Sequence, residues 1–139
     1  MRLAAMTTHV HLDLMGGDFS PSKAEQATGV TLHKKREVGD IGERGRYRGQ
    51  PIPYGSATLD APLSVNRGDK LSWVLGAALQ HIETFRQLGA DNIKVWIVEY
   101  FEPGGQMNMA YRPDELAKLG RLGVPLWVSG YETEQDLEV

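Results

Sequence analysis

The strongest constraint on the fold is an amphipathic segment near the middle of the chain. Apolar side chains recur there at alternating spacings of four and three residues, at Leu71, Leu75, Ala78, Ile82 and Phe85. This period places them on one side of an α-helix. Asp69 can cap the helix start and Gly89 follows the last turn, so the pattern predicts a helix over residues 70–88. Its apolar stripe must lie against a sheet or another helix.

Three apolar patterns predict strands on either side of this helix. Polar and apolar residues alternate in His9–Met15, with Val10, Leu12 and Leu14 on one face. Ser56–Val65 is a second strand, and Pro62 within it suits an edge or a bulge. Lys94–Phe101 is apolar on both faces, which is typical of a central strand that is covered on both sides or over most of its length.

The remaining strands and the longest loop follow from turn signals. Pro103-Gly104-Gly105 predicts a hairpin turn into a return strand, in which Met107, Met109 and Tyr111 alternate. The last predicted strand is Val124–Tyr131. Between Val30 and Pro53 the chain is rich in glycine and poor in apolar residues, so we expect a long exposed loop, and such loops are often functional.

Two shorter helices complete the order of elements. Ser20-Pro21 and Gly29 bracket one of them, and Pro113 and Gly123 bracket the other. The predicted fold class is α+β, with helices packed on a mainly antiparallel sheet. From residue 56 onward the order matches a ferredoxin-like (split βαβ) core, preceded by an extra strand and a short helix. We expect a disordered leader at 1–8, one domain at 9–131 and an acidic tail at 132–139.

Composition excludes several classes of function. The 139 residues include no cysteine, which excludes disulfides, thiolate catalysis and cysteine-ligated metals. A net charge of -3 disfavours nonspecific nucleic-acid binding as the main role. No segment matches a secretory signal or a membrane-spanning run, so a cytoplasmic location without membrane contact is expected. No cofactor is predicted.

The charge is unevenly distributed. Residues 1–70 hold ten basic against eight acidic residues, and residues 71–139 hold five against ten. Six of the ten basic residues in the first half lie in the segment 33–48. Within it, three guanidinium groups and an aromatic ring fall in five residues, at Arg44, Arg46, Tyr47 and Arg48. This cluster suits phosphate, an RNA backbone or an acidic protein surface, and we predict it as the partner-binding site. The alternative is that this cluster lies on a solvent-exposed loop and has no binding role.

Several short motifs, in this order and spacing, resemble a bacterial family, the domain of unknown function 4279. They are Asp18-Phe19-Ser20-Pro21, Thr28-Gly29-Val30, the basic stretch His33-Lys34-Lys35, the helix Leu71–Phe85, the strand Val95–Phe101, Pro113-Asp114-Glu115-Leu116 and Leu122-Gly123-Val124. The chain departs from the family at Arg112, a poor helix cap at a position that often holds Ser or Thr. The resemblance implies a compact fold over residues 9–131 and leaves the function open.

A second candidate site is polar. His9, His11 and Asp13 share one face of the first predicted strand, and Glu99 interrupts an otherwise apolar one. Two imidazoles and a carboxylate can converge on a metal, but side chains spaced along a strand lie too far apart without a further ligand. A buried Glu99 can act as a general acid or simply accept structural hydrogen bonds. We assign no catalytic residue and no metal site.

Three functions remain open. The first is a small binding protein, most concretely a bacterial immunity protein that neutralises a cognate toxin by occluding its active site. The second is an RNA- or nucleotide-binding module that uses the basic loop 33–48. The third is an enzyme with a site near Glu99 and the two strand histidines. The sequence does not determine the oligomeric state.

Overall fold

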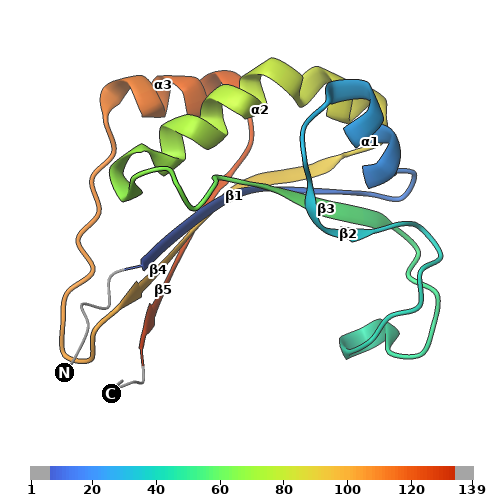
Figure 1. Ribbon diagram of the computed structural model, residues 1–139, viewed down its shortest axis with the longest axis horizontal. Coiled ribbons are helices and arrows are strands. Elements are labelled where there is room, and N and C mark those ends of the chain that lie inside the picture. Colours follow the sequence, from blue (N-terminus) through green and yellow to red (C-terminus); the bar gives the residue numbers. More distant parts are fainter. Residues whose placement is uncertain (1–6, 134–139) are drawn as a thin grey trace.

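The computed structural model describes residues 7–133, in which a five-stranded sheet carries three α-helices on one face (Figure 1). The strands are β1 (Thr7–Gly16), β2 (His33–Arg36), β3 (Gly55–Asp60), β4 (Asn92–Phe101) and β5 (Leu126–Glu132). The helices are α1 (Pro21–Thr28), α2 (Lys70–Gln87) and α3 (Pro113–Leu122), and two 3₁₀ turns are η1 (Gly45–Tyr47) and η2 (Arg67–Asp69). The predicted α+β class is confirmed.

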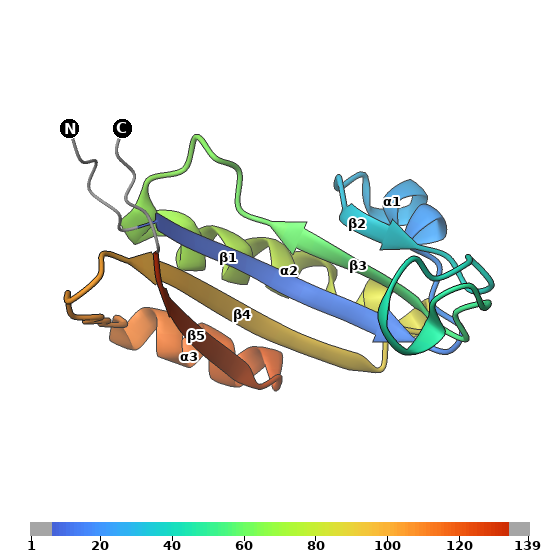
Figure 2. The same cartoon turned by 90° about the horizontal axis from the view of Figure 1, so that it is seen from below.

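The strand order is β2-β3-β1-β4-β5, which places the first strand at the centre of the sheet (Figure 2). Because β1 is antiparallel to both β3 and β4, these two run parallel to each other on either side of it. Helix α2 connects them, so β3, α2 and β4 form a split βαβ unit, in which the inserted strand is β1 and not a strand that follows residue 56. Helix α3 connects β4 to β5, which pair in parallel, as a crossover connection allows.

The predicted return strand at Met107, Met109 and Tyr111 is wrong. Strand β4 has β1 on one side and β5 on the other, so neither of its edges is free for a hairpin partner. Residues 102–112 instead form a connection without strand structure between β4 and α3. Met109 and Tyr111 pack against the hydrophobic core from this connection. The alternation in the sequence therefore reflects one-sided packing without ladder hydrogen bonds.

The core lies between the sheet and the helices. The predicted stripe of α2 is confirmed, because Leu75, Ala78 and Phe85 have no exposed surface and the rest of the stripe is nearly as buried. The covered side of β1 contributes Val10, Leu12 and Leu14. Phe19, just before α1, is also fully buried.

Strand β4 is covered on one side only, so the prediction of cover on both sides is wrong. Ile93, Val95 and Ile97 are buried beneath the helices. The intervening side chains, Lys94, Trp96 and Val98, lie on the opposite face and are only partly buried. Large side chains on that open face gave β4 its apolar appearance in the sequence.

The helix starts follow their capping chemistry. Ser20 Oγ accepts a hydrogen bond from the Lys23 N–H at 3.3 Å, and Pro21 is the first residue of α1, as predicted. Asp69 makes no side-chain capping bond to α2, which contradicts its predicted role. At α3, the Glu115 carboxylate accepts a hydrogen bond from the Arg112 backbone N–H at 3.0 Å. This bond from a residue inside the helix stabilises the helix start, although arginine itself is a poor N-cap residue.

The segment predicted as one long loop at Val30–Pro53 is more ordered than expected. It contains β2, and residues 37–54 fold back on themselves through the backbone pairs Gly39 N–H to Ile52 O at 2.8 Å and Gly42 N–H to Gln50 O at 2.9 Å. Strand β2 escaped prediction because its four residues, HKKR, show no apolar alternation. Strand β3 ends at Asp60, two residues before Pro62, which lacks the N–H that a ladder requires.

The ends of the chain qualify the predicted boundaries. Thr7 and Thr8 belong to β1, and Glu132 belongs to β5, so the domain extends beyond 9–131 at both ends. The rest of the predicted leader, residues 1–6, and of the predicted tail, residues 134–139, lies outside the described range. Within residues 7–133, no helix combines the length and apolar character needed to cross a membrane.

Candidate functional site

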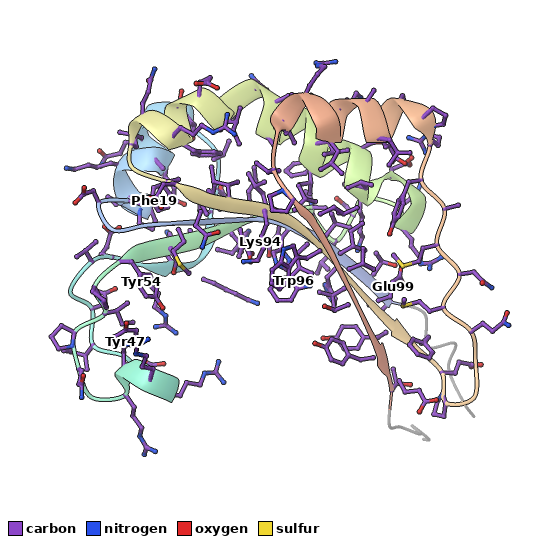
Figure 3. All side chains as sticks on the ribbon, turned by 180° about the vertical axis from the view of Figure 1, so that it is seen from behind. Phe19, Tyr47, Tyr54, Lys94, Trp96 and Glu99 are labelled. Atoms are coloured by element: carbon purple, nitrogen blue, oxygen red, sulfur yellow. The ribbon has the colours of Figure 1, made fainter. Side chains whose placement is uncertain are left out.

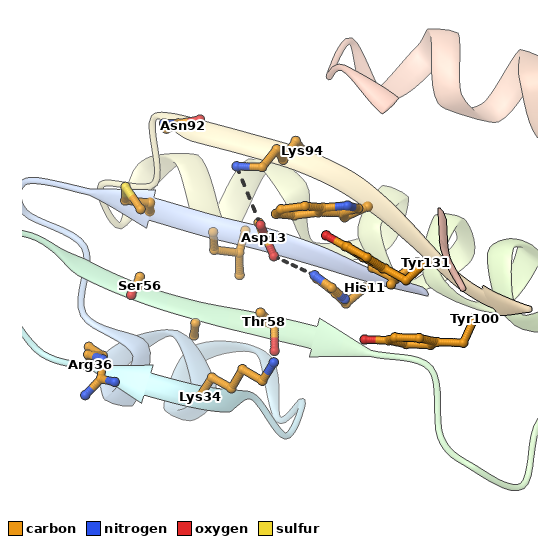
Figure 4. Close-up of a pocket in the computed structure, with 15 residues that line it drawn as sticks. His11, Asp13, Lys34, Arg36, Ser56, Thr58, Asn92, Lys94, Tyr100 and Tyr131 are labelled. Carbon is orange, nitrogen blue, oxygen red and sulfur yellow. Dashed lines mark ion pairs between the residues drawn. The ribbon is translucent and has the colours of Figure 1, made fainter. Parts of the chain in front are cut away.

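The face of the sheet opposite the helices is uncovered and hollowed (Figure 4). Strand alternation sends every second side chain of β1, β3 and β4 onto this open face. The hollow has a volume of about 610 Å³. It is lined by His11, Asp13, Leu14, Met15, Lys34, Arg36, Ser56, Ala57, Thr58, Asn92, Lys94, Trp96, Val98, Tyr100 and Tyr131.

A row of polar and charged side chains crosses the middle of the open face. Asp13 lies between two partners, with Oδ1 at 3.0 Å from His11 Nε2 and Oδ2 at 3.5 Å from Lys94 Nζ. The cross-strand register explains the second contact, because Asp13 of β1 pairs directly with Lys94 of β4. Asp13 is therefore a paired carboxylate on this face.

Aromatic rings occupy the β4–β5 side of the open face. Trp96 and Trp127 face each other across the parallel pair with ring centroids 5.5 Å apart, and Tyr100 and Tyr131 are stacked at 5.7 Å. The Lys94 ammonium lies 4.9 Å from the Trp127 ring centroid, a cation–π contact. The rings thus engage one another and Lys94. Trp127 and Tyr131 nevertheless remain about half exposed, at 50% and 51%.

Two cations of β2 face the same hollow from its other side. Lys34 and Arg36 line it, and Figure 4 shows the Lys34 side chain extending toward Thr58 of β3. The pairing of β2 with β3 is irregular, since His33 is opposite Thr58 but Arg36 is opposite Ser56. This extra residue on β2 is a bulge, and bulges redirect side chains. Lys34 within it has a φ of 50°.

The basic loop lies beside this hollow. Arg44, Arg46 and Tyr47 line an adjoining hollow of about 430 Å³, which shares Arg36 and Met15 with the first. The Arg46 guanidinium lies 5.4 Å from the Tyr47 ring centroid, and Tyr47 contacts Tyr54 edge to face at 6.0 Å (Figure 3). Three of the four predicted partner-binding residues therefore lie together. Arg48 is exposed and lines neither hollow.

Gly42 fixes the shape of the basic loop. A Cβ at this position would lie 2.3 Å from the Tyr47 carbonyl oxygen, a distance that no side chain tolerates. Backbone bridges from Gly42 to Arg48 and from Ile41 to Pro51 close the loop on both sides of η1. The loop therefore presents its arginines on an ordered backbone.

The predicted polar site does not assemble as one site. His9, His11 and Asp13 lie on the open face, whereas Glu99 lies on the helix-covered face of β4. His9 contacts Tyr100 edge to face at 5.8 Å, and only His11 reaches Asp13. The hypothesis of an enzyme that combines Glu99 with the strand histidines lacks the geometry it requires, because the sheet separates these groups.

Glu99 belongs to a buried polar network instead. Its side chain is 5% exposed, and Arg67 Nη2 donates to both carboxylate oxygens at 3.1 and 3.2 Å. Thr8 Oγ1 donates to the same carboxylate at 2.9 Å and accepts from Arg67 Nε at 2.7 Å. Burial, together with the nearby carboxylates of Glu99 and Glu115, raises the pKa of Tyr111 above its ordinary value. The network satisfies a buried carboxylate and thereby serves the fold.

A further groove of about 1000 Å³ is lined by α2, β3 and the residues before β2. All four histidines of the chain line it, at His9, His11, His33 and His81. Asp60 Oδ1 is buried without a hydrogen-bond partner. Among residues 7–133, however, no three His, Asp or Glu side chains converge closely enough to hold a metal ion.

Sequence reasoning missed several residues of the open face. It assigned no site role to Lys94, Trp96, Tyr100, Trp127 or Tyr131. The available signal was the period of two along β4, in which Lys94, Trp96, Val98 and Tyr100 alternate with the core residues. The pairing of Arg67 with Glu99 had no such signal, because 32 residues separate the two side chains.

Comparisons with known proteins add nothing to these observations. A scan against protein-family models, a search of curated proteins and a search of solved structures each find no match to this chain. Membership of the domain of unknown function 4279 family stays a prediction.

Proposed function

We propose that this chain is a small protein-binding protein, and in its most concrete form a bacterial immunity protein that occludes the active site of a cognate toxin. The observation that carries the proposal is the open face of the sheet. Its exposed aromatic side chains, Tyr100, Trp127 and Tyr131, lie beside the cations that surround the hollow. Tryptophan, tyrosine and arginine are the residue types that dominate binding energy at protein interfaces.

The arrangement of charge supports a selective partner. Lys34, Arg36, Arg44 and Arg46 lie along two adjoining hollows, and Glu43 and the paired Asp13 are the acidic residues among their linings. Such a field steers an acidic surface into register and accelerates association. The aromatic rings beside it then supply the apolar contact that slows dissociation.

The assignment to a toxin rests on the format of the molecule. An immunity protein needs one preformed face of complementary shape and charge, and a small rigid domain is sufficient to present it. The strands that carry this face are held from behind by three helices and a continuous core. Binding would therefore need little rearrangement, which lowers its entropic cost.

Co-expression tests the proposal. The gene adjacent to that of this chain would be expressed alone and with this chain, and bacterial growth would be measured. We expect this chain to restore growth and the double variant Trp127→Ser/Tyr131→Ser to lose the protection. Leu116→Ser, which changes an exposed residue of α3 on the opposite side, is the matched control. Failure of every adjacent product to form a complex with this chain would overturn the immunity assignment.

An RNA- or nucleotide-binding module is the second candidate. Cations and aromatic side chains lining one hollow favour it, because single-stranded nucleic acid uses both. Against it, Tyr100 and Tyr131 stack on each other, and Lys94 lies over the rings of Trp96 and Trp127. This candidate predicts binding that weakens steeply with salt and on Arg46→Ala or Arg48→Ala. A flat salt response would remove it.

A further inference from the structure

We propose that Lys34 and Arg36 form an anion-binding subsite on the open face, and that it receives the carboxylates of an acidic segment of the protein partner. This inference rests on the proposed function, because it names the chemistry of the partner at one end of the same face. It goes beyond the predicted site, which consisted of Arg44, Arg46, Tyr47 and Arg48.

The backbone at Lys34 is the first observation. Its φ of 50° lies in the left-handed region, and every other residue with positive φ in the described range is a glycine. A lysine is strained in this conformation, and such strain clusters at binding sites. The bulge between His33 and Arg36 creates this conformation next to the hollow.

The second observation is the state of neighbouring cations. Lys35 pairs with Glu25 at 3.0 Å, and with the Leu32 N–H it holds the pKa of Glu25 below its ordinary value. Lys94 pairs with Asp13. Lys34 and Arg36, by contrast, make no ion pair or side-chain hydrogen bond within residues 7–133. Of the three cations that line the hollow, Lys34 and Arg36 are thus the two available to a ligand.

The third observation is the polar lining around them. Ser56 and Thr58 of β3 and Asn92 at the start of β4 line the hollow with hydroxyl and amide groups. Arg36 also lines the adjoining hollow with Arg44 and Arg46, so the row of cations continues along the face. A guanidinium binds a carboxylate through two parallel hydrogen bonds, and an ammonium adds a point charge beside it.

The carboxylates of a protein segment fit this subsite better than the phosphates of a nucleic-acid backbone do. Phosphate binding by single-stranded RNA is accompanied by bases that stack on free ring faces. On this surface Tyr100 and Tyr131 stack on each other at 5.7 Å, so one face of each tyrosine ring is already in contact. Trp96 and Trp127 meet at a tilt of 56°, and the Lys94 ammonium lies 4.9 Å from the Trp127 ring centroid. An acidic protein segment needs only the cations and the exposed ring edges.

The alternative reading is that Lys34 has a structural role in the bulge. Lys34→Gly separates the two roles, because glycine adopts a φ of 50° without strain while the ammonium is lost together with the rest of the side chain. A structural lysine would give a variant that melts at a lower temperature. A ligand-binding lysine would give one that melts no lower than the wild type and binds anions more weakly.

The test uses a fluorescently labelled hexaglutamate peptide and fluorescence anisotropy at low salt. We expect Lys34→Gly and Arg36→Gln each to weaken binding about tenfold, the loss of one charge-assisted contact. Lys35→Gln removes the same charge one residue away, where Glu25 neutralises it, and we expect a change of less than about twofold. Equal losses in all three variants, or full binding by Lys34→Gly, would overturn the subsite.

Two further arms complete the test. Tighter binding of an eight-nucleotide uridine RNA than of the peptide, lost in the same variants, would overturn the carboxylate assignment. The Trp127→Ser/Tyr131→Ser variant should keep peptide binding while losing protection against the toxin. If the wild-type chain binds the peptide but gives no protection against a toxin, the proposed function is overturned and the subsite is not. If protection survives Lys34→Gly and Arg36→Gln, the subsite is overturned and the proposed function is not.

Discussion

The two faces of the sheet use the same strands in opposite ways. Along β4, the residues at 93, 95 and 97 are buried under the helices, and those at 94, 96 and 98 lie on the open face. The covered face holds aliphatic side chains and one network around Glu99, with its polar groups paired. The open face holds aromatic rings, the Asp13–Lys94 ion pair, and Lys34 and Arg36, which make no ion pair within residues 7–133. Stability is therefore expected to depend on one face and binding on the other, within the same ten-residue strand.

The largest expected effect comes from the covered face. Phe85 is fully buried between α2 and the sheet, and Phe85→Ala should lower the free energy of unfolding by about 3–5 kcal/mol through lost transfer energy and a cavity. Urea denaturation measures this change. A loss below about 1 kcal/mol would mean that α2 is not fixed on the sheet, and the contrast between the faces would fail.

The buried network should give the next effect. Arg67→Ala leaves the Glu99 carboxylate buried with Thr8 as a remaining donor, and we expect a loss of about 2 kcal/mol, discounted because the Arg67 side chain is half exposed. Arg121→Ala, at an exposed position of α3, is the control in the same denaturation assay. Indistinguishable stabilities of the two variants would show that water replaces Arg67.

A pH titration sharpens the comparison without removing a core side chain. The pKa of Tyr111 is higher in the folded protein than in the unfolded chain, so the folded state holds the phenol proton more tightly. This contribution is complete below the ordinary pKa and is lost as the pH rises through the folded pKa. Tyr111→Phe should reduce the alkaline fall in unfolding free energy above about pH 9. An alkaline slope identical to that of the wild type would contradict the assignment.

The smallest effect on stability is expected on the open face. Trp127 is half exposed on the edge strand β5, and Trp127→Ala should change the unfolding free energy by less than about 1 kcal/mol. The same variant should weaken binding of the protein partner far more than it changes stability, which calorimetric titration can measure. A destabilisation as large as that of Phe85→Ala would assign Trp127 to the core and erase the distinction.

Local patterns in the sequence were sufficient for the elements that carry apolar periodicity. The stripe of α2, the alternation of β1 and the limits of α1 and α3 all follow from side-chain spacing and capping. Strand β2 was missed because this edge strand has four basic residues and no buried apolar face, so its sequence shows no alternation of polar and apolar residues. The return strand at 107–111 was wrong because strand alternation does not reveal which edges of a sheet are already occupied.

The candidate site was predictable in part. The cluster of Arg44, Arg46 and Tyr47 stands out in composition, and the structure brings it beside the open face. The grouping of His9, His11 and Asp13 followed from the period of a strand, but the placement of Glu99 on the opposite face required the register of β4 against β1. Contacts such as Arg67 to Glu99 depend on a turn and a strand that meet only in three dimensions.

The central position of β1 also bears on how the chain reaches its fold. Strand β1 precedes both of its partners along the chain and pairs with residues 55–60 and 92–100, so Thr7 waits for a partner at Tyr100. Its two ladders close loops of very different length, and the longer one spans most of the domain. Such non-local pairing slows folding relative to a chain of local hairpins. Until β4 has emerged from the ribosome, the apolar side of β1 lacks half of its sheet, and collapse into the final topology must wait for that segment.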